Sequence, residues 1–288
     1  MQLALVLNPK SGGITDPDAL VETIRSRCSE LTVFDVGEAE AAAASRPDRL
    51  IVAGGDGSLG SAFAAADRHD VPLAVIPAGT ANDFARALGL PLDLAEATDL
   101  ATAAHPSLRK TWAGEANGRP FVNVASAGLA VDAAAAAESL KRMLGPAAYA
   151  AGAVRAGLEA RPVRASLAID GEETITGRVW QVLVGATGRF GGGSGLGDAV
   201  PGSPKLTVAW VPAGSRLTLP VRAIGLRSRT IERQPGVESW QTERPTIDAT
   251  RAGHVAAWNL DGERWEPDGA RVAFNPIGPA LIVVPGGR

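Results

Sequence analysis

The chain has 288 residues, of which 45% are hydrophobic and 20% are charged, and its formal net charge is −3. This composition is typical of a globular protein with a hydrophobic core, and the length suits two modest domains or one large one. The weak negative charge gives no reason to expect nucleic acid as a partner.

The cysteine count and the N-terminus point to a cytoplasmic protein. The single cysteine, Cys28, cannot form an internal disulfide, which fits a reducing compartment. The N-terminus lacks the basic start and full apolar core of a signal peptide, and no segment approaches the ~20 uninterrupted apolar residues that cross a bilayer. We therefore expect any membrane contact to be peripheral, at the inner surface. The alanine-rich stretch from Ala125 to Ala160 is expected to form a helix or a helix pair.

In the first hundred residues, short apolar runs alternate with segments of helical pattern. The runs expected as strands are Leu3–Leu7, Leu31–Asp35, Leu50–Ala53 and Leu73–Ile76. The segments expected as helices are Asp18–Cys28, Glu38–Ala44, Leu59–Asp67 and Asn82–Leu88. Uniformly apolar strands separated by helices indicate a parallel sheet covered on both faces, so this half is predicted to be an α/β domain.

The pattern changes after about Pro106, where strand-type runs follow one another without helices between them. These runs are Arg109–Trp112, Pro120–Ala125, Ala165–Ile169, Arg178–Val184, Leu206–Val211, Gly236–Trp240, Thr246–Ala249, His254–Asn259 and Arg271–Asn275. They predict a β-rich second domain of sandwich or barrel type. We place the α/β domain at residues 1–107 and the β-rich domain at 108–277. The last apolar run, Ala280–Val284, could return residues 278–288 to the first domain.

Three polar loops in the first half each follow a predicted strand, and all three contain glycine. They read Asn8-Pro9-Lys10-Ser11-Gly12-Gly13, Gly54-Gly55-Asp56-Gly57-Ser58 and Pro77-Ala78-Gly79-Thr80-Ala81-Asn82-Asp83-Phe84-Ala85-Arg86. At the carboxyl ends of parallel strands they would share the sheet edge where open α/β folds bind ligands. Glycine turns that open helices suit phosphate groups, although an ordinary tight turn explains the second loop taken alone. Neither the Rossmann fingerprint nor the Walker A loop is present.

In this order and spacing, the three loops resemble the catalytic domain of diacylglycerol kinases. Sphingosine and ceramide kinases are similar, and NAD kinases and phosphofructokinases are more distant. The Asn82-Asp83-Phe84 core is the most specific part, because it is typical of lipid kinases and not of NAD kinases. The resemblance continues through the second half and covers nearly the whole chain, at Asn123–Asp132, Gly191–Gly193, Gly236–Glu238 and Asp261–Glu263.

The resemblance implies a soluble bacterial lipid kinase that uses ATP and Mg²⁺. Its fold would hold the nucleotide on the α/β domain, with the active site in the cleft between the two domains. The acceptor would be a lipid or a lipid-like alcohol. Contacts to the nucleotide or its phosphates are implied for Asn8, Ser11, Gly54, Gly55, Gly57, Ser58, Gly79, Thr80, Asn82 and Arg86.

Four carboxylates carry the implied chemistry. Asp56 would repel a nucleotide unless a cation intervenes, so it helps to hold Mg²⁺–ATP or accepts a proton. Asp83 is the expected magnesium ligand, or else it places a negative charge at a helix N-terminus. The resemblance makes Asp261 the general base and Glu263 a supporting carboxylate. Residue pattern alone favours a plain hairpin turn at Asp261-Gly262. Arg86 neutralises phosphate charge or forms a surface ion pair.

Two positions depart from the family pattern. Many relatives carry Asp-Asp-Gly for a structural metal where this chain has Gly202-Ser203-Pro204, so no such metal is expected in the second domain. In the first loop, Gly12-Gly13 replaces a lysine that some relatives place after Ser-Gly. These differences put accessory features in doubt, and phosphotransfer itself is still expected.

Several questions stay open at this stage. Two other functions remain, an NAD kinase-like phosphotransferase and a nucleotide-binding regulator that has lost catalysis. The acceptor could be a diacylglycerol, a sphingoid lipid, phosphatidylglycerol or a non-lipid alcohol, and a homodimer is compatible with the sequence. Residues 216–233 contain five arginines and Glu232. They form either a solvated face or a dock for an anionic membrane.

Overall fold

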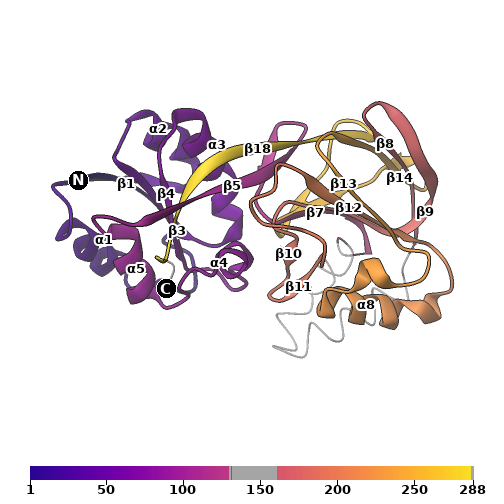
Figure 1. Ribbon diagram of the computed structural model, residues 1–288, viewed down its shortest axis with the longest axis horizontal. Helices are drawn as coiled ribbons and strands as arrows, with labels where there is room; N and C mark the ends of the chain where they lie inside the picture. Colours follow the sequence, from indigo (N-terminus) through magenta and orange to yellow (C-terminus); the bar gives the residue numbers. More distant parts are fainter. Residues whose placement is uncertain (130, 132–160, 287–288) are drawn as a thin grey trace.

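The computed structural model describes residues 1–129, 131 and 161–286, which form two lobes that lie side by side (Figure 1). The first lobe is an α/β unit and the second is β-rich, so both predicted fold classes are confirmed. Strand β18 (Arg271–Val284) passes from the second lobe into the first, with β5 (Ser107–Ala116) paired antiparallel beside it.

The first lobe is built on a sheet of parallel strands. β1 lies between β2 and β3, β4 pairs with the far side of β3, and all of these neighbours are parallel. β18 continues the sheet, since Ile282 pairs in parallel with Leu73 of β4. The strands are β1 (Gln2–Leu7), β2 (Glu30–Asp35), β3 (Arg49–Gly54) and β4 (Leu73–Pro77), with β6 (Arg119–Phe121) at the margin beside β5.

The helices of the first lobe follow its strands along the chain. They are α1 (Pro17–Arg25), the 3₁₀ turn η1 (Val36–Glu38), α2 (Ala39–Ala44), the 3₁₀ turn η2 (Asp56–Ser58), α3 (Leu59–His69), α4 (Asp83–Leu88) and α5 (Leu94–Thr102). Aspartates fix two of the starts: Asp16 accepts a hydrogen bond from Ala19 N, and Asp93 accepts one each from Ala95 N and Glu96 N. Helix α5 was not expected from the sequence.

Helices cover this sheet on both faces, because alternate side chains of a strand point to opposite sides. In β1, Ala4 and Val6 pack in the same cluster as residues of α2 and α3. Leu3 and Leu5 pack on the opposite face with residues of α1 and α5. Burial on both faces explains why the strand sequences are apolar without interruption.

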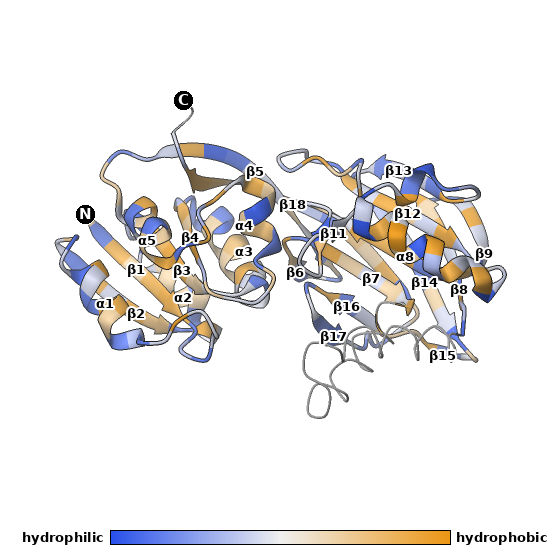
Figure 2. Cartoon of the chain, turned by 90° about the horizontal axis from the view of Figure 1, so that it is seen from below, coloured by the Kyte–Doolittle hydropathy of each residue, from blue (hydrophilic) through white to orange (hydrophobic). Residues whose placement is uncertain are grey.

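The second lobe is made of antiparallel strands around its own apolar core, and apolar strands run through both lobes in Figure 2. β16, β7, β9, β8 and β14 lie side by side in this order, and β12 pairs with both β9 and β13. The strands are β7 (Val124–Gly128), β8 (Val163–Ile169), β9 (Glu172–Gly185), β10 (Arg189–Phe190), β11 (Ser194–Gly195), β12 (Leu206–Pro212), β13 (Glu238–Thr242), β14 (Pro245–Arg251), β15 (His254–Val255), β16 (Trp258–Leu260) and β17 (Glu263–Trp265).

Two sequence expectations need correction. The runs 271–275 and 280–284 were expected as separate strands, whereas β18 is continuous and absorbs the interruption as a register shift between Ile277 and Ala280. The alanine-rich helix was expected to begin at Ala125, but residues 124–128 form β7, which is paired on both sides. Residues 130 and 132–160 of that expected helix lie outside the described residues.

Residues 216–233 are mainly helical. The 3₁₀ turn η4 (Arg216–Thr218) leads into α8 (Leu219–Ser228), and the 3₁₀ turn η5 (Ile231–Arg233) follows. Leu219 and Ile231 anchor this segment on strands β9 and β12. No helix within the described residues is long and apolar enough to cross a bilayer.

Candidate active site

The three glycine loops lie together at the carboxyl ends of β1, β3 and β4. Gly13 N donates to Ala78 O at 2.9 Å, which joins the first loop to the third. Ala78 N donates to Gly54 O at 2.8 Å, and Asn8 Nδ2 makes a long contact of 3.5 Å to Ser58 Oγ. Backbone hydrogen bonds therefore fix the three loops relative to one another.

Close packing between loops accounts for part of their glycine content. A Cβ atom on Gly79 would lie 2.6 Å from Gly55 Cα, and one on Gly55 would lie 3.1 Å from Gly79 Cα. A Cβ on Gly54 would lie 2.9 Å from Ser58 Oγ. Gly55 and Gly79 thus allow the close contact between the second and third loops, whatever they also do for a phosphate group, while Gly54 makes room for Ser58 of its own loop.

Asn82 shapes the third loop through its own side chain. Its φ angle of 50° lies in the left-handed region, which asparagine tolerates better than most residues. Its Oδ1 accepts from Gly79 N at 2.8 Å, and its Nδ2 donates to Gly79 O at 3.0 Å. Thr80, within this turn, is exposed and Ser11 of the first loop is partly exposed, so both are open to a ligand.

Asp56 connects the second loop to the third and to the second lobe. Its Oδ2 accepts from Asp83 N at 3.0 Å, and its Oδ1 accepts from Phe84 N at 3.0 Å, so it caps the start of α4 from another loop. Asn123 of the second lobe donates through Nδ2 to Asp56 Oδ1 at 3.0 Å. Thr187 holds Asn123 in place by donating to its Oδ1 at 2.7 Å.

Asp83 lies where the two lobes meet and is 3% exposed. Its Oδ2 accepts from Gly192 N of the second lobe at 3.0 Å, and no described residue donates to its Oδ1. Burial raises the pKa of Asp83 above its ordinary value, and the nearby Asp56 carboxylate adds to the rise, while Gly192, Arg86 and Arg189 oppose it.

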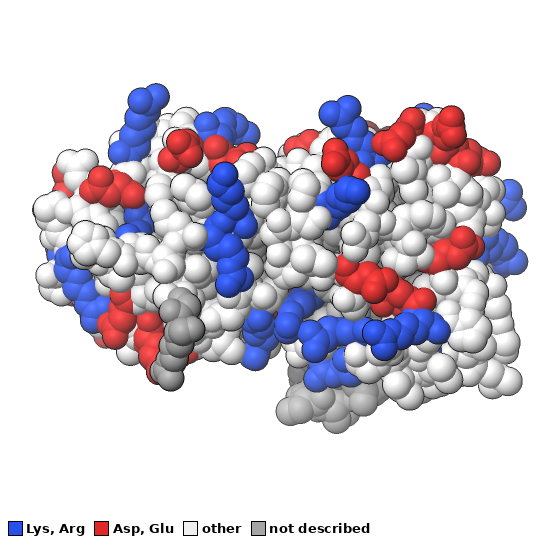
Figure 3. All heavy atoms as spheres, viewed as in Figure 1, with Lys and Arg blue, Asp and Glu red and all other residues white. Residues whose placement is uncertain are grey.

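Basic side chains surround this side of the site. Arg86 donates from Nε to Ala81 O at 3.0 Å and lies near Asp83. Burial lowers the pKa of Arg189, and the neighbouring positive charges of Arg229 and Arg86 lower it further. Figure 3 shows basic side chains gathered over α8 and toward the boundary between the lobes. Arginines from both lobes therefore converge where a polyanion would be bound.

Asp261 is held by the backbone of the segment that leads into β7. Its Oδ2 accepts from Val122 N at 2.5 Å, and its Oδ1 accepts from Asn123 N and Val124 N, both at 2.9 Å. A carboxylate has about four acceptor positions, so one remains, on Oδ2. The φ angle of Asp261 is 49°, as expected of the turn between β16 and β17. Asp261 is thus both a hairpin aspartate and a carboxylate at the cleft.

Burial raises the pKa of Asp261 from 3.8 to about 7. The three backbone hydrogen bonds oppose this rise because they favour the charged form, and the Asp56 carboxylate adds to it. A carboxyl group that titrates near neutral pH can accept a proton under ordinary conditions.

A pocket of about 190 Å³ lies between Asp261 and the second glycine loop. It is lined by Asp56, Gly57, Gly60, Ser61, Arg119, Pro120, Leu260, Asp261, Glu263 and Trp265. Glu263 reaches across from the second lobe, since a Cβ on Gly57 would lie 2.8 Å from its Oε1. The pocket therefore joins the Asp56 loop of one lobe to the Asp261–Glu263 hairpin of the other.

The predicted site residues divide into two groups around Asp56. Asp261, Glu263, Asp56 and Gly57 line the pocket. The others lie in the loops outside that lining, and of these Asp83 and Arg86 face the second lobe's glycine run and arginines. Asp56 links the groups because it lines the pocket and accepts hydrogen bonds from Asp83 and Phe84.

Comparison with known proteins assigns two family domains to the chain. Residues 2–110 match the diacylglycerol kinase catalytic domain, and residues 123–284 match the YegS C-terminal NAD kinase beta sandwich-like domain. The chain carries a diacylglycerol kinase catalytic domain, and the second match, which spans more than half of the chain, shows that it belongs to the family with the YegS C-terminal NAD kinase beta sandwich-like domain. The resemblance inferred from the loop motifs is thereby confirmed.

Individual relatives match over part of their length. The chain is 38% identical over 158 residues to a Pseudomonas aeruginosa protein named "Probable lipid kinase YegS-like", and the match covers 51% of each chain. It is 37% identical over 158 residues to a diacylglycerol kinase of Staphylococcus epidermidis, covering 50% of this chain and 49% of that one. These matches therefore span about half the length of the curated relatives.

Solved structures share the fold over nearly the whole chain. A diacylglycerol kinase from Bacillus anthracis superposes with a TM-score of 0.74 at 21% identity, covering 98% of this chain and 96% of that one. An NAD kinase from Archaeoglobus fulgidus in complex with ATP gives a TM-score of 0.52 at 13% identity, and the superposition covers 98% of this chain and 93% of that one. At these identities the likeness shows the common two-lobed fold.

A kinase of this family is expected to use Mg²⁺, and the residues of the site partly suit a bound Mg²⁺ ion. Among the described residues, no group of three or more His, Cys, Asp or Glu side chains forms a complete protein cage. The buried Asp83 Oδ1 lacks a hydrogen-bond donor, and Asp56 and Asp83 repel each other. Mg²⁺ is commonly held by one or two carboxylates together with substrate phosphates. Asp56 and Asp83 would provide these carboxylates.

Sequence reasoning assigned no role to Asn123, Thr187 or Arg189, and placed Arg229 only in the arginine-rich stretch 216–233. Asn123 and Thr187 act through long-range hydrogen bonds that leave no local pattern. Arg189 did carry a signal, because it stands two residues before the Gly191–Gly193 run, and a cation beside a glycine turn suits an anion.

Proposed function

We propose that this kinase-family protein transfers the γ-phosphoryl group of ATP to a hydroxyl group of a lipid. One observation carries the proposal: Asp261 of the second lobe and the Asp56–Gly57 loop of the first line the same pocket. A proton acceptor on one lobe and a phosphate loop on the other would bring acceptor and nucleotide together. This arrangement explains why the reaction needs two lobes.

In this proposal Asp261 accepts the proton of the attacking hydroxyl. One acceptor position on its Oδ2 is left by the backbone amides, and its pKa of about 7 suits proton transfer at neutral pH. The three amides also fix the direction in which this position points, so the hydroxyl would be oriented as well as deprotonated. Glu263 lies beside Gly57 at the mouth of the same pocket and would orient the acceptor.

The nucleotide would lie against the glycine loops, with its phosphates toward Arg86 and Arg189. Catalysis of phosphoryl transfer depends on positioning and on stabilising charge that spreads over the phosphoryl oxygens. Arg86 comes from the first lobe and Arg189 from the second, so closure of the lobes on ATP would add positive charge from both sides. Asp56 and Asp83 would hold Mg²⁺, whose charge would offset the repulsion between these two carboxylates and the nucleotide.

The acceptor lipid would reach the protein from a membrane surface touched by α8. Val221 and Ile224 of α8 are 57% and 66% exposed, and their spacing of three residues places them on one helical face. Leu217, in the preceding 3₁₀ turn η4, is 88% exposed. The nearby Arg216 and Arg227 are also exposed. Apolar side chains flanked by arginines are typical of helices that lie in the interface of an anionic bilayer.

Two alternative functions, phosphorylation of NAD and ATP binding without catalysis, can be tested against this one. NAD kinases share the fold, as the Archaeoglobus structure illustrates, so NAD is the second acceptor to test. A regulator that binds ATP without catalysis is disfavoured because both Asp56 and Asp261 line the pocket. Retention of this pair is expected of an active phosphotransferase.

The experiment is a phosphorylation screen with labelled ATP and Mg²⁺. Acceptors would be diacylglycerol, a sphingoid base and phosphatidylglycerol in mixed micelles, with NAD and glycerol as soluble controls. Incorporation of label into one lipid class supports the proposal. Label in NAD alone favours the NAD kinase alternative, and ATP binding without transfer to any acceptor favours the regulator.

A further inference from the structure

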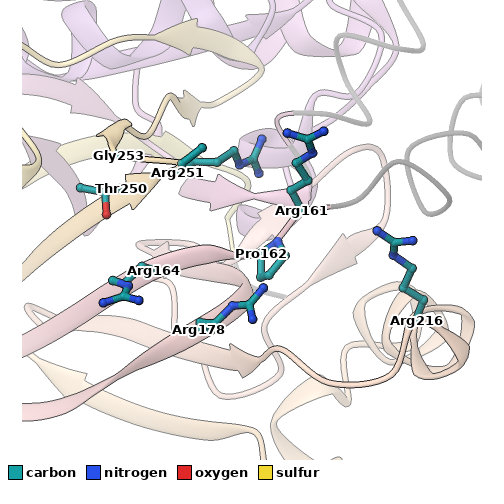
Figure 4. Close-up of a pocket in the computed structure, with 9 residues that line it drawn as sticks. Arg161, Pro162, Arg164, Arg178, Arg216, Thr250, Arg251 and Gly253 are labelled. Atoms are coloured by element: carbon teal, nitrogen blue, oxygen red, sulfur yellow. The ribbon is translucent and has the colours of Figure 1, made fainter.

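A second pocket, of about 700 Å³, is lined by residues of the second lobe and shares no lining residue with the active-site pocket. Its side chains are shown in Figure 4. It is lined by Arg161, Pro162, Arg164, Arg178, Arg216, Thr250, Arg251, Ala252 and Gly253. Five of these nine residues are arginines and none is Asp or Glu, so the described lining carries positive charge alone.

Strand register places two of these arginines directly opposite each other. Arg164 of β8 pairs with Arg178 of β9, and on its other side Arg164 pairs with Thr250 of β14. Opposed residues project from the same face of a sheet, with Cβ atoms about 4.5–5.5 Å apart. Their neighbours Val163 and Val179 are buried in the core, so the arginines project outward. Like charges opposed in this way destabilise a sheet.

Charge compensation for this pair is lacking among the described residues. No hydrogen bond or ion pair within residues 1–129, 131 and 161–286 engages the side chain of Arg161, Arg164 or Arg178. Figure 4 shows the guanidinium group of Arg178 beside Pro162, with those of Arg161 and Arg251 above it and that of Arg216 farther to one side. They come from separate segments of the lobe, so the fold assembles the cluster from distant parts of the chain.

We propose that this pocket binds a phosphate group carried by a ligand, through Arg164 and Arg178. Arginine presents a planar fork of donors that matches phosphate oxygens, and a dianion between two arginines removes their mutual repulsion. A volume of about 700 Å³ lies within the usual range for small-molecule pockets and leaves room for more than the phosphate group. The inference is independent of the proposed kinase reaction, because it uses none of the active-site residues.

The test compares wild type with Arg164→Gln and Arg178→Gln, and with Arg244→Gln as the matched control. Arg244 is an exposed arginine of the same lobe that does not line the pocket. Glycerol 3-phosphate and inorganic phosphate are the soluble probes, titrated at constant ionic strength with chloride. Vesicles of phosphatidylcholine with or without phosphatidic acid are the membrane-bound probes.

The expected result is binding by wild type and by Arg244→Gln, with affinity about tenfold lower for each pocket variant. Loss in the soluble titrations assigns a free phosphate compound, and loss confined to phosphatidic acid vesicles assigns a lipid headgroup. Without any probe, the pocket variants should melt about 1–3 °C higher than wild type, because the opposed charges are relieved. The proposal is overturned if all four proteins respond equally to every probe.

Discussion

Replacing Asp261 by Asn tests the hydrogen bonds and the burial of this carboxylate together. Three backbone donors, from Val122, Asn123 and Val124, point at the two oxygens of Asp261. Asparagine has one oxygen that can accept two of them, and its amide group cannot accept the third. A buried donor left without a partner costs about 1–3 kcal/mol, so Asp261→Asn should lower the unfolding free energy by about that amount.

The loss should depend on pH in a predictable direction. The pKa of Asp261 rises from 3.8 to about 7 on folding, so the native state keeps a proton that the unfolded chain releases between these values. The contribution of the Asp261 carboxyl group to the free energy of unfolding is therefore fully present below about pH 4, and it is lost as the pH rises through 7. The slope is at most about 1.4 kcal/mol per pH unit. Asparagine does not titrate, so the difference in unfolding free energy between wild type and variant should narrow between about pH 4 and pH 7.

Urea unfolding at a series of pH values measures this gap. The control is Asp268→Asn, because Asp268 begins the other late Asp-Gly pair, is exposed and does not line the active-site pocket. The control should differ from wild type by less than about 0.5 kcal/mol at every pH. If the gap for Asp261→Asn stays constant with pH, the carboxylate is not buried in the way described here.

Three further predictions concern the nucleotide loops, the cleft arginine and α8. Gly79→Ala should lower the free energy of unfolding by about 1–3 kcal/mol, because the new Cβ would lie 2.6 Å from Gly55 Cα. The same change should weaken ATP binding in a calorimetric titration. Gly12→Ala, where nothing lies within 4 Å of the new Cβ, is the control, and equal losses would contradict the packing argument. Arg189→Gln should raise the KM for ATP about tenfold, and an unchanged KM would remove Arg189 from the phosphate site. Leu217→Gln with Ile224→Gln should weaken sedimentation with anionic vesicles while stability changes by less than about 0.5 kcal/mol; undiminished sedimentation would rule α8 out as the membrane contact.

The parts of the fold that the sequence predicts well are those whose environment is uniform. β1 and β3 are almost wholly buried, so their apolar runs stand out. β9 was expected only as Arg178–Val184, because its first residues, from Glu172 to Gly177, are largely exposed and mixed in character. β18 was divided in the prediction because Pro276, Gly278 and Pro279 are typical strand breakers, whereas pairing with β5 carries the strand past them.

The candidate site was predicted where short motifs carry it and was missed where distant segments build it. Asp56 stood out through its Gly-Asp-Gly context, whereas Asp261 was assigned only through the family resemblance, because its Asp-Gly pair alone favours a hairpin turn. The hydrogen bonds of Asp261 join residues 137 to 139 positions apart, and the bond from Asn123 to Asp56 spans 67 positions. The contact between Gly55 and Gly79 likewise depends on how two loops meet, so the sequence alone could not separate packing from phosphate binding.

The central claim is that Asp261 acts as proton acceptor for phosphoryl transfer to a lipid hydroxyl in the pocket between the lobes. The most direct measurement is single-turnover transfer of label from ATP to the lipid found in the phosphorylation screen, by wild type and by Asp261→Asn, across pH. Wild type should lose rate as pH falls through about 7, and the variant should be ~10²–10⁴-fold slower with ATP affinity nearly unchanged. Near-normal turnover by Asp261→Asn would contradict the account and transfer the proton-accepting role to Asp56.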